Sequence, residues 1–317
     1  MRSMQNRQDT TRTSMKLISR YIFILSILII VLSACVGTNP SPTITVPTNT
    51  RVIESQTPLT ATIQATTGVS ATETSVQPTS IPPFNCPENR GEVTRSYITT
   101  KELPGRLYFT TYLPPCYSDS SKYPVLYLLH GKSSQDDQWV RLGLADVMNK
   151  QISNSKLPPF IVVMPYDPGW EDPDTGNYDL AIGESLIRWI DSEYSVKEDR
   201  KFRAIGGVSR GSAWAFHTAL LYPQLFSIVG IHSPAFFRAD RRNMESILPD
   251  FSKNKFPIRV ILDVGTRDPE FNYAGIFEDL LTKNDIEHTW QMLDGNHSEA
   301  YWRENLLMYL QEYSKDW

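Results

Sequence analysis

Short apolar runs alternate with amphipathic segments along residues 123–313, and this alternation constrains the fold more than any other feature of the chain. The apolar runs have the length of buried β-strands, and the segments between them repeat apolar side chains at helical spacing. The expected strands span residues 123–129, 160–164, 202–208, 227–231, 258–264 and 289–293. The expected helices span residues 142–152, 178–194, 211–221, 273–282 and 299–313. Repeated strand–helix units predict an α/β fold, with a mostly parallel central sheet flanked by helices on both faces.

Two further strand-like runs precede this region. Residues 92–99 and 106–113 have the composition of β-strands, and residues 101–105 between them are rich in turn-forming types. Two such runs joined by a short turn predict an antiparallel hairpin. The fold is therefore expected to begin with an N-terminal antiparallel hairpin, followed by the parallel strands.

The first 34 residues have the pattern of a secretory signal peptide. Five basic side chains and the single acid Asp9 precede an apolar run at residues 21–32. A membrane-spanning helix, the alternative, needs about 20 apolar residues, and this run is shorter. Leu32–Cys35 (LSAC) resembles the lipobox of bacterial lipoproteins, in which the cysteine is diacylated and becomes the mature N-terminus. The resemblance implies a chain anchored to the membrane through Cys35, at the cell surface or the periplasmic face; secretion without a lipid is the alternative.

Residues 35–85 differ in composition from the rest of the chain. Half of the fifty residues that follow Cys35 are Ser, Thr or Pro, and only three of them are charged. Such a segment cannot bury enough apolar surface to offset its chain entropy, so we expect a disordered tether. Residues 86–317 are long enough for one α/β domain with a full core.

The charge of the chain argues against a nucleic-acid partner. The net charge is −4, and removal of residues 1–34 takes away five basic side chains and one acid, which leaves −8. Proteins that bind nucleic acid present a basic surface instead.

Two of the three cysteines remain outside the signal and lipobox. A hairpin centred near residue 101 would place Cys86 and Cys116 opposite each other at its open end. Outside the cytoplasm this arrangement favours a disulfide. A pair of buried free thiols is the alternative.

The segment Gly207–Gly211 (GVSRG) matches the G-x-S-x-G motif of a strand–turn–helix nucleophile. A predicted strand enters it and a predicted apolar helix leaves it, which is the context that the motif requires. Such a turn lifts Ser209 above the sheet, at the N-terminus of the helix. We interpret Ser209 as a nucleophile; a glycine-rich structural turn is the alternative.

A serine nucleophile needs a histidine base and an acid that orients it. His297 lies after the last predicted strand, the position that the chain order Ser…Asp…His requires. Asp268 lies in a loop beyond a strand, between Ser209 and His297, and is the preferred acid. Asp263, within that strand, is the alternative acid.

The oxyanion of an acyl-transfer intermediate needs backbone N–H donors. We expect one from Arg210, which follows the nucleophile, and one from Lys132, in the loop after the strand at residues 123–129. The spacing of the histidines, cysteines and acids suggests no metal site, and the reaction needs neither a metal nor an organic cofactor.

Four segments together resemble a known family. They are YPVLYLLHG (residues 123–131), GVSRG, DVGTRD (263–268) and GNHSEAYWRENL (295–306). They resemble the putative-esterase family of α/β-hydrolases, which includes feruloyl, acetylxylan and enterochelin esterases, esterase D-type enzymes and mycolyltransferases. The resemblance covers roughly residues 90–315. It implies an α/β-hydrolase fold with Ser209 as nucleophile, Asp268 as acid and His297 as base. Lys132 departs from the glycine-rich continuation of many relatives.

These observations favour an extracytoplasmic, membrane-anchored serine carboxylesterase that acts on small-molecule or polysaccharide esters, such as carbohydrate-linked acyl or feruloyl esters. Acyl transfer of the mycolyltransferase type is one alternative, since both reactions pass through an acyl-enzyme. A non-catalytic surface lipoprotein that binds glycans is the other.

Overall fold

The computed structural model describes residues 86–169, 172–252 and 255–317, without the side chains of residues 250–252. The predicted signal peptide (residues 1–34), the lipidation site Cys35 and the tether (residues 35–85) lie outside these residues. Among the described residues, no helix combines the length and apolar composition that crossing a membrane requires.

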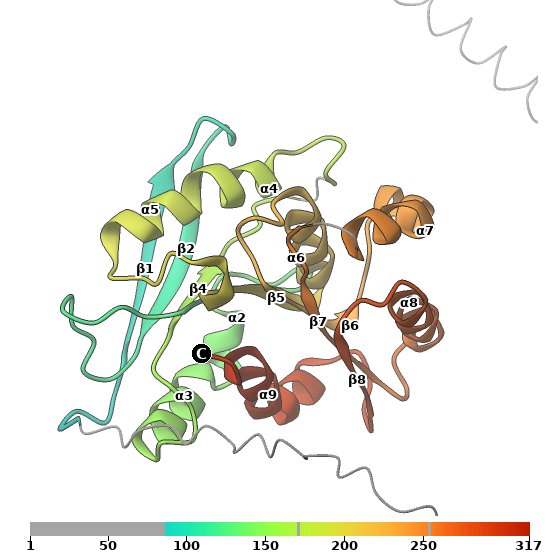
Figure 1. The fold of residues 1–317 in the computed structure, drawn as a ribbon. Coiled ribbons are helices and arrows are strands. Elements are labelled where there is room, and N and C mark those ends of the chain that lie inside the picture. The colour runs from blue at the N-terminus through green and yellow to red at the C-terminus, as the bar shows by residue number, and fades with distance from the viewer. Residues whose placement is uncertain (1–85, 170–171, 253–254) are drawn as a thin grey trace, which may run out of the picture. The chain divides into compact units, whose positions relative to one another are not determined.

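A mixed sheet of eight strands is the centre of the fold (Figure 1). The strands are β1 (Glu92–Thr99), β2 (Arg106–Leu113), β3 (Val125–Leu129), β4 (Ile161–Pro165), β5 (Arg203–Ser209), β6 (Ile228–Pro234), β7 (Arg259–Gly265) and β8 (His288–Leu293). Their order is β1-β2-β4-β3-β5-β6-β7-β8. The pairs β1–β2 and β2–β4 are antiparallel, and every other neighbouring pair is parallel. The loops after β3 to β8 therefore leave the sheet along one edge, where ligands bind in open α/β sheets.

Helices cover both faces of this sheet, as Figure 1 shows. They are α2 (Gln138–Arg141), α3 (Leu144–Ser153), α4 (Tyr178–Leu180), the π-helical turn η1 (Ala181–Leu186), α5 (Ile187–Glu193), the 3₁₀ turn η2 (Arg200–Phe202), α6 (Arg210–Leu221), α7 (Arg238–Ser252), α8 (Phe271–Lys283) and α9 (Glu299–Ser314). Helices α2, α3 and α9 lie on one face, and α4 to α8 lie on the other.

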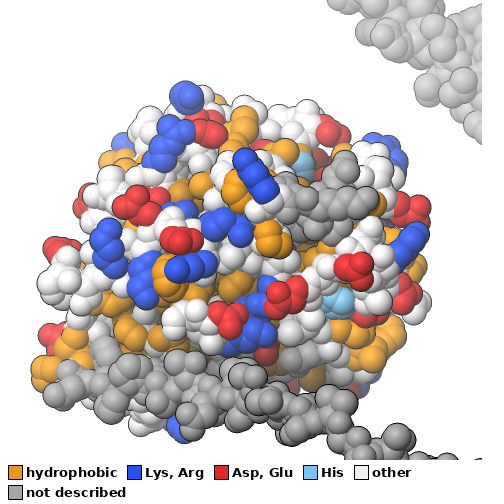
Figure 2. Space-filling view, in the orientation of Figure 1, with side chains coloured by type: hydrophobic (Ala, Val, Ile, Leu, Met, Phe, Trp, Pro, Cys, Tyr) orange, Lys and Arg blue, Asp and Glu red, His pale blue; other side chains and the backbone are white. Residues whose placement is uncertain are grey.

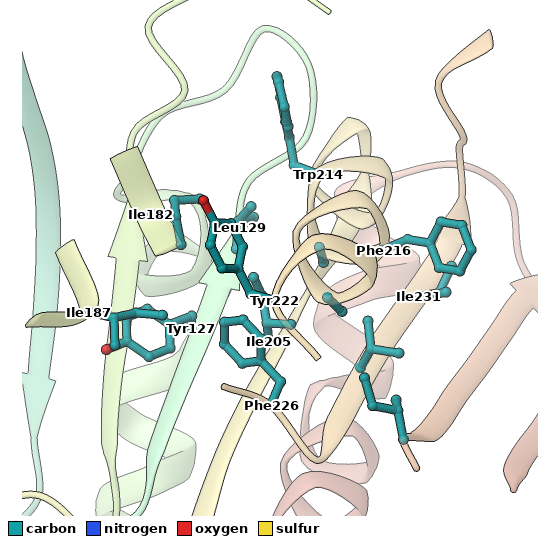
Figure 3. Close-up of a cluster of buried hydrophobic side chains, with 14 of the residues drawn as sticks. Tyr127, Leu129, Ile182, Ile187, Ile205, Trp214, Phe216, Tyr222, Phe226 and Ile231 are labelled. Atoms are coloured by element: carbon teal, nitrogen blue, oxygen red, sulfur yellow. The ribbon is translucent and has the colours of Figure 1, made fainter. Parts of the chain in front are cut away.

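The apolar side chains form two clusters, one on each face of the sheet. Figure 3 shows part of the first cluster, in which Tyr127 and Ile205 of the sheet lie near Phe226, and Phe216 of α6 lies near Ile231 of β6. The strands β3, β4, β6 and β7 are buried along their whole length, as expected for strands covered on both faces. The predicted α/β sheet with helices on both faces is confirmed.

The predicted elements and the observed ones differ mainly where a helix is interrupted. The helix predicted at residues 142–152 is observed as α3, which begins at Leu144. Gly143 has a left-handed φ of 99° and separates α3 from α2. Residues 178–193 are helical as expected, but η1 widens the helix in the middle of the run. Strand β6 extends to Pro234, so His232 lies inside it and not after it.

The N-terminal hairpin is present, with Thr99 opposite Arg106. Its centre therefore falls between residues 102 and 103, slightly beyond the predicted position near residue 101. Cys86 and Cys116 lie outside the paired strands, at the open end of the hairpin, and form a disulfide across a Cα–Cα distance of 6.0 Å. The disulfide fastens the segment before β1 to the segment after β2.

One face of the molecule carries basic and acidic side chains interspersed with each other (Figure 2). Among the described residues, charged side chains pair as ions across elements, for example Arg141 of α2 with Glu299 of α9 at 3.1 Å.

Candidate active site

Ser209 lies at the sharp turn between β5 and α6. It is the last residue of β5, and α6 begins at the next residue, Arg210. Its backbone has φ 53° and ψ −124°, a combination that is strained for any residue with a side chain. Strain of this kind is maintained by surrounding structure and clusters at functional sites. Ser209 is the N-cap residue of α6, so it lies at the end of the helix where a developing negative charge is favoured.

Close packing explains the glycines of this turn. A Cβ atom on Gly211 would lie 2.4 Å from the carbonyl oxygen of Leu129, and one on Gly207 would lie 2.7 Å from the same oxygen. Both contacts are with rigid backbone, so a side chain at either position would push β3 away from the turn. Ser212 completes the turn, since its hydroxyl donates to the carbonyl oxygen of Ser209 at 2.6 Å and accepts the Ala235 N–H at 3.0 Å.

His297 and Asp268 come together at the same edge of the sheet. His297 lies between β8 and α9, Asp268 lies after β7, and the Nδ1–Oδ2 distance between them is 2.8 Å. The other carboxylate oxygen, Oδ1, accepts the Glu270 N–H at 2.9 Å. The Asp268 side chain is buried, whereas the His297 side chain is 28% exposed. The imidazole is therefore bonded through Nδ1 to a buried carboxylate, while part of the ring remains accessible to solvent.

The environment of Asp268 favours its ionised form. Burial by itself would raise the pKa of this carboxyl, but hydrogen bonds from His297, the Glu270 N–H and Ser233 outweigh burial and hold the pKa below its usual value. An ionised acceptor at Oδ2 assigns the Nδ1 proton to His297, and the Nε2 atom is then able to accept a proton.

Asp263, the alternative acid, has different partners. It is buried within β7, and its Oδ1 atom lies 2.6 Å from His232 Nδ1. Its Oδ2 atom accepts the hydroxyls of Tyr301 at 2.7 Å and Tyr309 at 3.0 Å, both on α9. The structure thus pairs His297 with Asp268, and Asp263 belongs to a separate buried network.

The loop after β3 lies against the turn that carries Ser209. A Cβ atom built on Gly131 would lie 3.6 Å from the Cβ atom of Ser209, which shows how closely the two backbones approach. Lys132 and Arg210, the two residues expected to supply oxyanion donors, line the same pocket of about 190 Å³. The Gly131 N–H is bound by Gln138 Oε1 at 2.8 Å, so the loop is anchored to α2.

Comparison with known proteins identifies the family. The family model described as "Putative esterase" matches residues 100–313. The chain belongs to the putative esterase family. It is thus an esterase by family, with the α/β-hydrolase fold, as the sequence resemblance implied.

Individual relatives of the esterase agree with this assignment. The endo-1,4-beta-xylanase/feruloyl esterase of Xylanibacter ruminicola is 32% identical over 120 residues, which cover 35% of this chain and 16% of that protein. The match thus spans about one sixth of that relative's length. Among solved structures, a ferulic acid esterase superposes with a TM-score of 0.63 at 21% identity, over 71% of this chain and 99% of the other. An S-formylglutathione hydrolase from Staphylococcus aureus superposes with a TM-score of 0.57 at 16% identity, over 71% of this chain and 99% of the other.

The other four histidines of the esterase have partners of their own. His130 is buried, donates from Nδ1 to the Gly131 carbonyl oxygen and accepts the Asp167 N–H at Nε2, and burial lowers its pKa. This arrangement requires a neutral ring, which fixes the loops after β3 and β4 to each other. His232 faces Asp263, His217 faces Asp240 at 3.0 Å, and His288 faces Glu278 at 3.3 Å.

Several residues of the site are absent from the sequence-based prediction. Asp167 follows β4 and accepts Arg210 Nε at 2.7 Å and Trp214 Nε1 at 3.0 Å, so it holds the arginine that follows Ser209. Asp167 lies in the loop after an apolar strand, as Lys132 does, so the sequence could have indicated it. Gln138 carries no such signal, because its role depends on the tertiary contact between α2 and the loop after β3.

Proposed function

We propose that Ser209, His297 and Asp268 form the catalytic triad of this esterase. The observation that carries the proposal is the 2.8 Å contact between His297 and Asp268, at the sheet edge where the strained turn presents Ser209. The orientation of the pair supports it further, since Asp268 accepts a hydrogen bond from the Nδ1–H group and leaves Nε2 to act as a base.

In the proposed mechanism, His297 Nε2 removes the proton of the Ser209 hydroxyl as its oxygen attacks the ester carbonyl carbon. The carbonyl π electrons move to oxygen, and the Lys132 and Arg210 N–H groups stabilise this oxyanion. The C–O bond to the alcohol then breaks, and His297 returns the proton to the departing alkoxide. A water molecule then attacks the acyl-enzyme while His297 removes its proton. The bond to Ser209 breaks, His297 returns the proton to Ser209, and the acid is released. Asp268 remains ionised throughout and stabilises the imidazolium.

We further propose that the substrates are carbohydrate-linked acyl or feruloyl esters. Two relatives support it by the activities in their names, a xylanase/feruloyl esterase and a ferulic acid esterase. The pocket that Lys132 and Arg210 line supports it as well, because Ser133, Ser134, Gln135 and Tyr166, residues that carry hydroxyl or amide groups, also line it. Such groups match the hydroxyl-rich alcohol part of a sugar ester.

The experiment that tests this function uses the full chain, purified in detergent, and a panel of feruloyl, acetyl-xylan, short-chain p-nitrophenyl and siderophore esters. We expect release of the free acid, fastest from the sugar-linked esters. A parallel reaction with an excess of a sugar, whose hydroxyl groups can accept the acyl group, measures acyl transfer. A new ester in place of free acid would show that the protein is a transferase. A chain that cleaves none of the esters would contradict the proposal.

Cell attachment is a separate proposal, namely that Cys35 carries the lipid that holds the esterase on the outer side of a membrane. It is supported by the sequence of residues 32–35 and the apolar run before them. We expect the wild-type chain to partition into the detergent phase, and Cys35→Ser to lose its lipid and partition into the aqueous phase, since two acyl chains give stable attachment. Metabolic labelling with a radioactive fatty acid provides the measurement. Equal labelling of both proteins would contradict lipidation at Cys35.

A further inference from the structure

Asp167 connects the two segments that carry the expected oxyanion donors, namely the loop after β3 with Lys132 and the start of α6 with Arg210. It lies in the loop after β4, and β4 neighbours β3 in the sheet. Its side chain is almost fully buried, yet both of its carboxylate oxygens accept hydrogen bonds and its backbone N–H donates one. A buried polar group that is satisfied in this way makes the groups around it more rigid.

The carboxylate holds the start of α6 through two side chains. Arg210 and Trp214 are four residues apart, so they lie on the same face of the helix. Asp167 Oδ2 accepts Arg210 Nε at 2.7 Å and Trp214 Nε1 at 3.0 Å. The Arg210 guanidinium also lies over the Trp214 ring, with its Cζ atom 5.6 Å from the ring centroid. One carboxylate oxygen therefore fixes the first two turns of α6.

A second acid lies near Arg210 but is far more exposed to water. Arg210 Nη1 lies 3.3 Å from Asp172 Oδ1. The Asp172 side chain is 57% exposed, and ion pairs with an exposed partner are weakened by water and salt. The side chains of Arg210 and Asp167 are 14% and 7% exposed, so their attraction is less screened. Asp167 is therefore the carboxylate that determines the position of Arg210.

The backbone N–H of Asp167 holds the loop after β3. It donates to His130 Nε2 at 2.9 Å, and the other ring nitrogen, Nδ1, donates to the Gly131 carbonyl oxygen at 2.8 Å. These contacts fix the two residues directly before Lys132. Gln138 fastens the same loop to α2, whereas Asp167 links it to α6.

The separation of the two donors matters because an oxyanion is stabilised only over a narrow range of distances. Each N–H should lie about 2.7–3.1 Å from the oxygen of the tetrahedral intermediate. The Arg210 N–H belongs to a helix and the Lys132 N–H to a loop after another strand, so contacts between these segments must set their separation. Asp167 bonds to both segments, and support of this kind holds a site within about 0.5 Å of its working geometry.

We propose that Asp167 is a positioning residue of this esterase, which sets the separation of the Arg210 and Lys132 N–H groups. The inference rests on the proposed function. Without the carboxylate, Arg210 Nε and Trp214 Nε1 lose a buried acceptor, and a buried donor without a partner is unfavourable. The start of α6 then relaxes away from the loop after β3, and the oxyanion receives weaker hydrogen bonds. Substrate binding, which does not involve the oxyanion, changes little.

The test compares Asp167→Asn and Asp167→Ala with the wild-type full chain in detergent. Both variants keep the backbone N–H that binds His130, and asparagine also keeps the shape of the side chain. We expect kcat for p-nitrophenyl acetate to fall about tenfold in Asp167→Asn, as for the loss of a hydrogen bond to a charged group, and further in Asp167→Ala, with KM nearly unchanged. Trifluoroacetophenone, whose adduct with a catalytic serine carries an oxyanion, should bind more weakly by the same factor as kcat falls.

Asp191→Asn is the matched control, because it removes another carboxylate–arginine pair, at the other end of β5. Asp191 Oδ1 and Oδ2 accept Arg203 Nη2 at 2.8 Å and 2.7 Å, and Arg203 is the first residue of the strand that ends at Ser209. This variant measures what the loss of such an ion pair does to stability alone. Its kcat and its affinity for the ketone, measured on the folded protein, should equal those of the wild type.

A purely structural role for Asp167 predicts a different pattern. In that case both Asp167 variants would unfold at a lower temperature, while kcat and the affinity for the ketone would stay at wild-type values in the folded protein; that result overturns the proposal. A higher KM with unchanged kcat would overturn it as well, because it places Asp167 in substrate binding. If the wild type cleaves no ester but binds the ketone, and Asp167→Asn weakens that binding, the proposed function fails and the positioning role stands.

Discussion

Replacing Ser209 by alanine is expected to abolish ester hydrolysis while the fold survives. Removal of the nucleophile in serine hydrolases lowers kcat by about 10⁶-fold, and what remains comes from binding and the oxyanion donors. Alanine at φ 53° carries the same backbone strain as serine, so the strain offers no reason for a change in stability. We expect a melting temperature within a few degrees of the wild type by circular dichroism, and no detectable release of p-nitrophenol from p-nitrophenyl acetate.

A fluorophosphonate probe adds a direct test of the same assignment, because it forms a covalent bond only with an activated serine. The wild type should be labelled, and Ser209→Ala should not. Ser192→Ala serves as the control, since the Ser192 hydroxyl on α5 is exposed and donates only to the Trp189 carbonyl oxygen. It should be labelled like the wild type. Undiminished labelling of Ser209→Ala, or full activity in it, would remove Ser209 from the mechanism.

The sequence predicts much of the site because the candidate catalytic residues lie at or just after the ends of predicted strands. Residues 203–209 form a strand that runs into a helix, and the glycines at 207 and 211 are required by close backbone contacts, so local patterns locate Ser209. His297 and Asp268 each follow a parallel strand, and parallel strands bring their carboxyl ends to one edge. The geometry between them is tertiary, but chain order and topology are enough to suggest the pairing.

The remaining partners depend on contacts that a local pattern does not encode. Ser233 accepts the Trp302 indole N–H at 2.9 Å from a part of β6 whose register with β5 is irregular, whereas the sequence predicts that this strand ends at residue 231. Gln138 binds the Gly131 N–H because α2 packs beside the loop after β3. Asp263 looks like a candidate acid in the sequence, and only the fold shows that His232 and two tyrosines surround it.

Helix α9 connects these separate partners. Its first turn carries Glu299, which accepts Gln138 Nε2 at 3.1 Å, so the helix is tied to the loop that holds Lys132. In the same turn, Tyr301 contacts Asp263 and Trp302 contacts Ser233. Burial, followed by the charge of Asp263, raises the pKa of the Tyr301 hydroxyl, which keeps it protonated as a donor. Since His297 lies just before this helix, the position of the base depends on how α9 docks.

The two candidate acids can therefore be separated by matched substitutions, Asp268→Asn and Asp263→Asn. For Asp268→Asn, an amide at this position can donate to Nδ1 and so favour the wrong imidazole tautomer. We expect kcat to fall by about 10⁴-fold, with the unfolding midpoint in urea nearly unchanged.

For Asp263→Asn the expected effects are reversed. The charge that His232, Tyr301 and Tyr309 share is lost from a fully buried network that joins β6 and β7 to α9. An amide at this position cannot accept hydrogen bonds from all these buried donors, and a buried donor left without an acceptor costs about 1–3 kcal/mol. The urea midpoint should therefore fall clearly, while kcat of the folded fraction should stay within about tenfold of the wild type. Urea unfolding followed by tryptophan fluorescence, together with kcat measured well below the transition, separates the two effects. A collapse of kcat in stable Asp263→Asn protein, with Asp268→Asn still active, would make Asp263 the acid, because only the residue that holds the base in its working tautomer controls the rate without controlling the fold.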